Sequence, residues 1–311
     1  MEHKPTTGMS LSTGSSRLGR RQFLRLCGLG GGALLAGCNN DERPLAPDIP
    51  PRSEWMDPGS LQSRMTTVND ISMHALISVD AAPPDAPPLV LVHGSGLSGQ
   101  YMIPTARMLT PYFPIYVPDI PGYGASGDPG KILNVEEMAD WLVDWMDAIR
   151  LPRASFLGNS FGCQVIVELA ARYPEYTERL LLQGPTTPPE ERSAFRQFTR
   201  WRQNEPYNPM WLGDVTQEDY DRAGALRLIQ SYIYQVRDPI EKKAPRIQAP
   251  TLIMRGEHDP VAYQEFCEEL AQLFPRGELV LVPDVAHTLV FTAPEALTKA
   301  TREFMAREVS S

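Results

Sequence analysis

The amino-acid sequence predicts an α/β fold, namely a mostly parallel sheet flanked by helices and interrupted by a helical insertion. From about residue 88 onward, short apolar runs alternate with stretches of helical periodicity. Strands that alternate with helices form a parallel sheet covered on both faces. Residues 186–248 break this alternation, because they show no strand pattern and are rich in aromatic and arginine residues.

The core elements fall on either side of that insertion, in residues 63–185 and 249–311. Two strands joined at Asn69-Asp70 predict a hairpin, since this dipeptide suits a tight turn. Further strands are predicted at 88–93, 113–119, 154–158, 179–183, 251–255 and 278–282. Helices are predicted at 100–110, 135–149, 161–173, 262–273 and 293–308.

The first 37 residues predict an export signal. Arg20 and Arg21 precede an apolar stretch, an order that resembles a twin-arginine signal. The stretch is too short and glycine-rich to span a bilayer stably. It ends in Leu35-Ala36-Gly37-Cys38, which resembles a lipobox. We expect export to the periplasmic or cell-surface side, with a lipid on Cys38 that anchors the chain to the membrane. The alternative is plain cleavage nearby, with Cys38 incidental.

The mature chain is expected to be acidic and tethered. Loss of residues 1–37 removes five basic residues and one acidic residue, so the formal net charge falls from −9 to −13. This charge argues against nucleic acid as a partner, because phosphate contacts need clustered cations. Residues 38–62 contain five prolines among polar and charged residues, which predicts an extended tether.

The motif that carries the chemistry is Gly158-Asn159-Ser160-Phe161-Gly162. It lies between a predicted strand and a predicted helix, the context in which a sharp turn exposes a nucleophilic serine. Glycines are expected on both sides of the turn because bulkier residues would clash with the neighbouring strand and helix.

Three further segments follow the ends of predicted strands. His93-Gly94-Ser95-Gly96 follows the first buried strand, and we assign the oxyanion hole to the N–H groups of Ser95 and Phe161. His93 itself is expected to be structural. Asp259 and His287 each follow a later strand, and catalytic groups gather at the carboxyl ends of strands in such sheets.

With these motifs in the order Ser, Asp, His, residues 63–308 resemble the α/β-hydrolase family. The resemblance implies a catalytic triad of Ser160, Asp259 and His287, and it identifies 186–248 as a helical cap. Its aromatic residues suggest a small-molecule substrate, an apolar or aromatic ester. Neither a metal-ligand set nor a nucleotide or redox motif is evident, so no cofactor is expected.

Alternatives to an ester hydrolase remain open. The Asn159-Ser160 pair and the segment after strand 88–93 also resemble hydrolases that cleave a carbon–carbon bond in ring-cleavage dienoates. In that case Asn159, Arg192 and Arg196 are candidate substrate-binding residues, the arginines for a carboxylate. Thr288 stands where that subgroup would carry tryptophan. A perhydrolase and a non-catalytic, lipid-anchored binding protein are the other options.

Overall fold

A computed structural model of the protein describes residues 50–79 and 82–307. One eight-stranded sheet has the order β1-β2-β4-β3-β5-β6-β7-β8. β2 pairs antiparallel with β1 and β4, and the other neighbouring strands pair in parallel, which confirms the predicted fold class. The strands are β1 Leu61–Val68, β2 Ile71–Ser78, β3 Leu89–Val92, β4 Ile115–Pro118, β5 Ala154–Asn159, β6 Thr177–Gln183, β7 Thr251–Gly256 and β8 Gly277–Val282.

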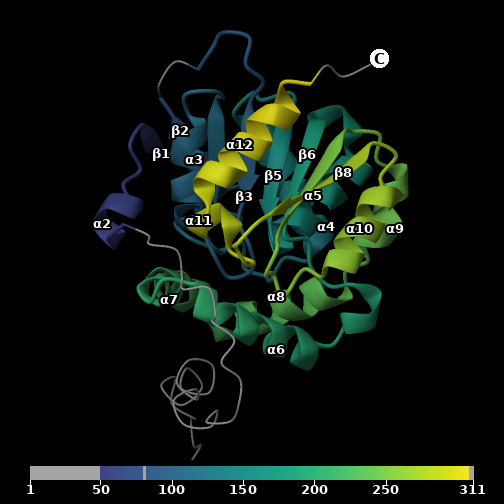
Figure 1. Ribbon diagram of the computed structural model, residues 1–311. Coiled ribbons are helices and arrows are strands. Elements are labelled where there is room, and N and C mark those ends of the chain that lie inside the picture. Colours follow the sequence, from purple (N-terminus) through teal and green to yellow (C-terminus); the bar gives the residue numbers. More distant parts are fainter. Residues whose placement is uncertain (1–49, 80–81, 308–311) are drawn as a thin grey trace, which may run out of the picture. The chain divides into compact units, whose positions relative to one another are not determined.

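Helices cover both faces of this sheet. α3, α11 and α12 lie in front of it in Figure 1, and α4 and α5 lie behind. The core helices are α3 Ile103–Leu109, α4 Val135–Ala148, α5 Phe161–Arg172, α10 Gln264–Leu273, α11 Leu289–Thr292 and α12 Pro294–Met305. Each layer buries its own apolar cluster, so the sheet is the middle of three layers.

The continuous apolar run of β3 shows why this strand is central. Leu89 and Leu91 pack into one cluster, Val90 and Val92 into the other, and all four are fully buried. A strand buried on both faces needs such a run, because successive side chains point to opposite sides. Burial of each side chain contributes about 1.5–3 kcal/mol.

Local signals account for two element boundaries. Asn69 and Asp70 both have positive φ, at 46° and 64°, as a two-residue hairpin turn requires. α4 begins at Val135 because Asn134 and Glu137 form a reciprocal capping box, in which each side chain accepts from the other's backbone N–H.

The core begins before the predicted boundary at residue 63. Residues Arg52–Trp55 form the short helix α2, and β1 starts at Leu61. Trp55 is only 7% exposed, and its indole N–H donates to the carbonyl oxygen of Phe291 at 3.0 Å. The tether prediction for 38–62 was therefore wrong over residues 52–62, because the proline content concealed a buried tryptophan and the first strand.

The insertion is helical, as predicted. Its helices are α6 Ala194–Asn204, α7 Leu212–Ala223, α8 Ala225–Arg237 and α9 Ile240–Lys243. α6, α7 and α8 lie across one end of the sheet in Figure 1. This is the end at which β3, β5, β7 and β8 finish, so the insertion covers the loops that carry the predicted triad, and we call 186–248 the cap.

The predicted export signal and Cys38 lie outside the described residues, as do residues 39–49 of the predicted tether. Within 50–79 and 82–307, no helix has both the length and the apolar character needed to cross a bilayer.

The position of Trp55 yields a stability prediction. Trp55→Ala should lower the free energy of unfolding by about 3–5 kcal/mol, because it leaves a cavity against α11 and an unsatisfied carbonyl. Denaturant unfolding measures this change. Arg52→Ala, on the exposed side of the same helix, should cost less than about 1 kcal/mol. If both variants lose an equally small free energy of unfolding, α2 does not belong to the core.

Candidate active site

Ser160 sits at a strained turn between β5 and α5. Its backbone has φ 52° and ψ −116°, a region that non-glycine residues rarely adopt. A Cβ on Gly158 would lie 2.7 Å from the nitrogen of Cys163, and one on Gly162 would overlap the carbonyl oxygen of Val92. Both flanking glycines are thus required by close backbone approach.

Ser160, His287 and Asp259 form one hydrogen-bonded chain. Nε2 of His287 lies 3.0 Å from Oγ of Ser160, and its Nδ1 lies 2.8 Å from Oδ2 of Asp259. Asp259 and His287 are buried, whereas Ser160 is partly exposed. The structure therefore brings together the three residues that the sequence suggested, across 127 positions of chain.

The Asp259 loop is fixed by its own backbone. Oδ1 of Asp259 accepts hydrogen bonds from the N–H groups of Val261 and Ala262, at 2.7 and 2.9 Å. The Arg255 guanidinium donates to the carbonyl oxygens of Ala262 and Asp259. One carboxylate oxygen is thus held by the loop, and the other is aimed at the imidazole of His287.

Gly184, which follows β6, lies against the imidazole. It has φ 62°, and a Cβ there would lie 2.9 Å from Cε1 of His287 and 3.4 Å from Oδ2 of Asp259. A side chain at this position would press on the His–Asp pair. The sequence reasoning missed this residue, although a glycine directly after a buried strand was the available signal.

The proposed oxyanion segments meet beside the serine. Phe161 is the first residue of α5, where backbone N–H groups have no partner within the helix. Ser95 lies in the loop after β3. Within the described residues, neither N–H donates a hydrogen bond to protein. A Cβ on Gly94 would lie 2.9 Å from Oδ1 of Asn159, so this loop packs directly on the turn that carries Ser160.

His93 holds this loop in place through hydrogen bonds of both ring nitrogens. Its Nδ1 lies 3.0 Å from the carbonyl oxygen of Gly94, and its Nε2 accepts from the N–H of Ile120 at 3.2 Å. Burial lowers the pKa of His93, although the charge of Asp119 and the Gly94 carbonyl oppose the shift. A neutral imidazole with both nitrogens engaged agrees with the structural role expected for it.

Asn159 does not face a substrate site. Its side chain is 2% exposed and donates to Oε1 of Gln183 at 2.5 Å, while the Gln183 amide donates to the carbonyl oxygen of His287 at 2.9 Å. The substrate-binding prediction for Asn159 was therefore wrong, because its side chain is buried under the turn. Together, Asn159 and Gln183 connect the serine turn to the His287 loop.

Arg192 and Arg196 are also occupied elsewhere. Arg192 pairs with Glu241 at the start of α9, at 2.5 Å. Arg196 donates to the carbonyl oxygen of Glu190, and its side chain is 61% exposed. In the described structure neither arginine contacts the triad. Their assignment to a substrate carboxylate stays a prediction, which these partners do not support.

The cap supports the histidine loop directly. The buried side chain of Asn204, at the end of α6, accepts the backbone N–H of His287 at 2.8 Å. Asn208 accepts from the hydroxyl of Thr288 at 2.7 Å. These contacts join residues about eighty positions apart, and nothing in the local sequence marks them.

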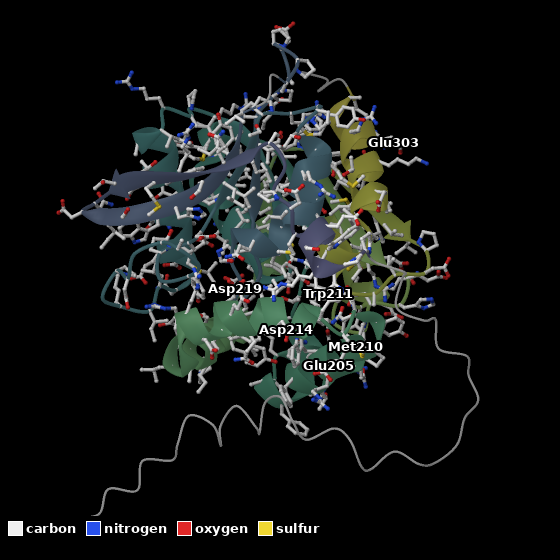
Figure 2. All side chains as sticks on the ribbon, turned by 90° about the vertical axis from the view of Figure 1, so that its left-hand side faces the viewer. Glu205, Met210, Trp211, Asp214, Asp219 and Glu303 are labelled. Carbon is white, nitrogen blue, oxygen red and sulfur yellow. The ribbon has the colours of Figure 1, made fainter. Side chains whose placement is uncertain are left out.

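A second cap contact reaches the oxyanion loop. Asp219 of α7 accepts hydrogen bonds from the hydroxyl and the N–H of Ser98, at 2.7 and 2.9 Å. Figure 2 shows Asp219 and Trp211 on the side of the cap toward the core, with Met210 and Glu205 farther from it. Burial raises the pKa of Asp219 to about 6, with a further contribution from Asp119.

Asp119 fixes the other end of that loop. It accepts the N–H groups of Gly99 and Ala125 and lies 2.8 Å from Nδ1 of His74. Burial opposes its ionisation, but the hydrogen bonds from His74, Gly99 and Ala125 leave its pKa below the ordinary value. His74 is therefore a buried structural partner of Asp119.

One group of side chains has the composition of a metal site. Glu257, His258 and Asp284 place ligand atoms within 4.8 Å of one another on the outer side of the triad loops. Both carboxylates are exposed, and His258 stacks on Tyr207 with ring centroids 5.9 Å apart. Cys163 and Cys267 are free and buried, so no disulfide joins them.

Comparison with known proteins places this geometry in context. A family model described as the alpha/beta hydrolase family matches residues 89–300. Carboxylesterase YbfK of Bacillus subtilis is 26% identical over 247 residues, which cover 73% of this chain and 83% of that protein.

Two solved structures share the fold. A membrane phospholipase A superposes with a TM-score of 0.68 at 22% identity, over 82% of this chain and 88% of that one. A 2-hydroxy-6-oxo-6-phenylhexa-2,4-dienoate hydrolase from Rhodococcus gives 0.64 at 18% identity, over 79% and 99%. At these identities the likeness extends to the fold alone.

The Asn204 contact predicts a positioning effect. Asn204→Ala should slow covalent labelling of Ser160 by a fluorophosphonate about 10-fold or more, because the unsatisfied His287 N–H, costing about 1–3 kcal/mol, shifts the imidazole. Asn204→Asp keeps an acceptor oxygen and should retain most of the rate. Gln203→Ala, exposed on the same turn, is the control, and an equal loss there would refute the assignment.

Asp219 predicts a pH-dependent component of stability. Its pKa of about 6 in the folded chain exceeds the unfolded value of about 3.9. The folded state therefore binds more protons between these values. The contribution of Asp219 to the free energy of unfolding is fully present below about pH 4 and is lost as pH rises through about 6. Denaturant unfolding across this pH range should show that the wild type loses stability relative to Asp219→Asn. Parallel plots of the free energy of unfolding against pH for the two proteins would contradict this prediction.

Proposed function

Because the chain belongs to the α/β-hydrolase family, we propose that it is a serine hydrolase that cleaves carboxylic esters through an acyl-enzyme on Ser160. The observation that carries this proposal is the Ser160–His287–Asp259 chain, with separations of 3.0 and 2.8 Å at the ends of three parallel strands. Homologous hydrolases, including a carboxylesterase, support the reaction class.

The mechanism starts with activation of the serine. His287 accepts the hydroxyl proton as Oγ attacks the ester carbonyl, and Asp259 stabilises the imidazolium that results. The developing oxyanion lies against the N–H groups of Ser95 and Phe161. His287 then protonates the departing alcohol, and a water molecule activated by the same imidazole hydrolyses the acyl-enzyme.

The cap supplies an apolar wall near the oxyanion loop. A Cβ on Gly96 would lie 2.5 Å from Cδ2 of Leu228 and 2.9 Å from Cε1 of Tyr220, so both side chains rest on this loop. An apolar acyl or aryl group is the partner that such a wall favours. The preference for an apolar or aromatic ester rests on these two residues.

The place of action is a further part of the proposal. We infer export to the periplasmic or cell-surface side and attachment through a lipid on Cys38. The support is the order of paired arginines, apolar stretch and lipobox-like Leu35-Ala36-Gly37-Cys38 in the sequence. Mass spectrometry of the protein extracted from membranes tests this directly: a diacylglyceryl group on an N-terminal Cys38 is expected.

Carbon–carbon bond hydrolysis has weaker support. The fold likeness to a dienoate hydrolase is consistent with it. However, Arg192 and Arg196, the residues suggested for the substrate carboxylate, are held by acidic or backbone partners of the cap. Ester cleavage needs no such cation, so it is the function that the geometry supports best.

Turnover of p-nitrophenyl esters, from acetate to longer acyl chains, tests the proposal. Ser160→Ala should lower kcat by roughly 10⁴-fold or more, because it removes the nucleophile. Ser95→Ala is a matched control, since it retains the backbone N–H and should keep most of the activity. If the intact chain turns over no ester, the esterase proposal is wrong. A ring-cleavage dienoate is then the next substrate to test, and a non-catalytic binding protein is the remaining alternative.

A further inference from the structure

Exposed large apolar side chains gather on the cap. Ten large apolar residues are exposed among the described residues, and six of them belong to the cap. The other four lie on the core, namely Met65, Val79, Leu273 and Leu281. Phe195 and Leu226 are each 76% exposed, and Met210 is 99% exposed. We call the six residues the cap face: Phe195, Phe198, Trp201, Met210, Leu226 and Ile229.

α6 supplies the aromatic part of the cap face. Phe195, Phe198 and Trp201 recur at three-residue spacing, and the rings of Phe198 and Trp201 stack with centroids 6.2 Å apart. Gln197 and Asn204 of the same helix are buried. α6 thus has a buried polar side and an apolar side in water, so packing within the cap does not explain its aromatic residues.

α8 continues the cap face. Leu226 and Ile229 lie about one turn apart, and the Tyr232 hydroxyl of the same helix donates to the carbonyl oxygen of Ala194 at 3.1 Å. α6 and α8 also run close together in the cap in Figure 1.

The charges around this face favour a bilayer over a second copy of the chain. α6 carries Arg196, Arg200 and Arg202 and no acidic residue, although Glu191 and Glu205 compensate part of that charge. Aromatic rings and arginines together suit the interface between acyl chains and headgroups. Two mature chains, each with a formal charge of about −13, would repel one another.

The N-terminal end of the fold lies at the cap. Arg52 of α2 pairs with Glu218 of α7 at 2.7 Å. Arg52 lies fourteen positions after Cys38, a reach of at most about 50 Å when extended. A lipid on Cys38 would therefore leave the cap within reach of the membrane.

We propose that the cap face docks onto a phospholipid bilayer and turns the cap toward the membrane. This docking uses surface residues alone, so it is independent of the proposed esterase activity. Because Asn204 and Asp219 connect the cap to the His287 and Ser98 loops, a docked cap would lie between the membrane and the active site.

Vesicle partitioning tests the proposal. The full-length Cys38→Ser chain carries no lipid, and its signal segment is the same in all variants. With phosphatidylcholine vesicles, Phe195→Ser/Leu226→Ser should partition about tenfold more weakly, because two apolar side chains are lost from the contact. Met65→Ser/Leu281→Ser, which removes exposed apolar residues outside the cap, should partition like the parent.

Two further readouts locate the contact. Lipids brominated in the acyl chain should quench the fluorescence of Trp201. The part of the emission that is absent from Trp201→Phe identifies the signal of this residue. The midpoint of denaturant unfolding should be the same in both double variants, which verifies folding. Equal partitioning of the two double variants, or no quenching of Trp201, would overturn the proposal. A dimer in solution that Phe195→Ser/Leu226→Ser dissociates would instead assign the cap face to a second copy.

Discussion

The backbone of Ser160 is the constraint on which the active site depends. A residue at φ 52° and ψ −116° is held only if its surroundings leave no alternative. Here the N–H of Ser160 donates to the carbonyl oxygen of Gln183 at 2.8 Å, and α5 packs so closely on β3 that only glycine fits at position 162. The strain thereby places the hydroxyl above the sheet, within reach of an imidazole from another strand.

The cap completes this arrangement as well as covering it. Asn204 satisfies the N–H of His287, and Asp219 satisfies the N–H of Ser98. A buried N–H without a partner is costly, so both loops depend on the cap for their order. The catalytic geometry therefore belongs to the core and the cap together, which explains why a change in the cap can act on the reacting atoms.

The parts of this protein that sequence predicted are those with local signals. Buried strands appear as apolar runs, and the Ser160 turn as glycines at fixed spacing. The Asn204 contact spans 83 residues, and the Arg192–Glu241 pair spans 49, so neither leaves a local pattern. Asn159 was assigned wrongly because the direction of a side chain beside a strained turn depends on that strain. Trp55 was overlooked because composition averages conceal a single buried ring.

The place of the cap in the chain limits how it could be replaced. The cap is inserted between β6 and β7, and so precedes both the aspartate and the histidine loops. Because β6 and β7 are neighbouring strands, the cap enters and leaves the core at neighbouring points, which is the geometry that domain insertion tolerates. In this chain an exchanged cap would also have to bring an acceptor for the His287 N–H. Replacement of the cap is therefore limited by the acceptor oxygens of Asn204 and Asp219, which a new cap would have to reproduce.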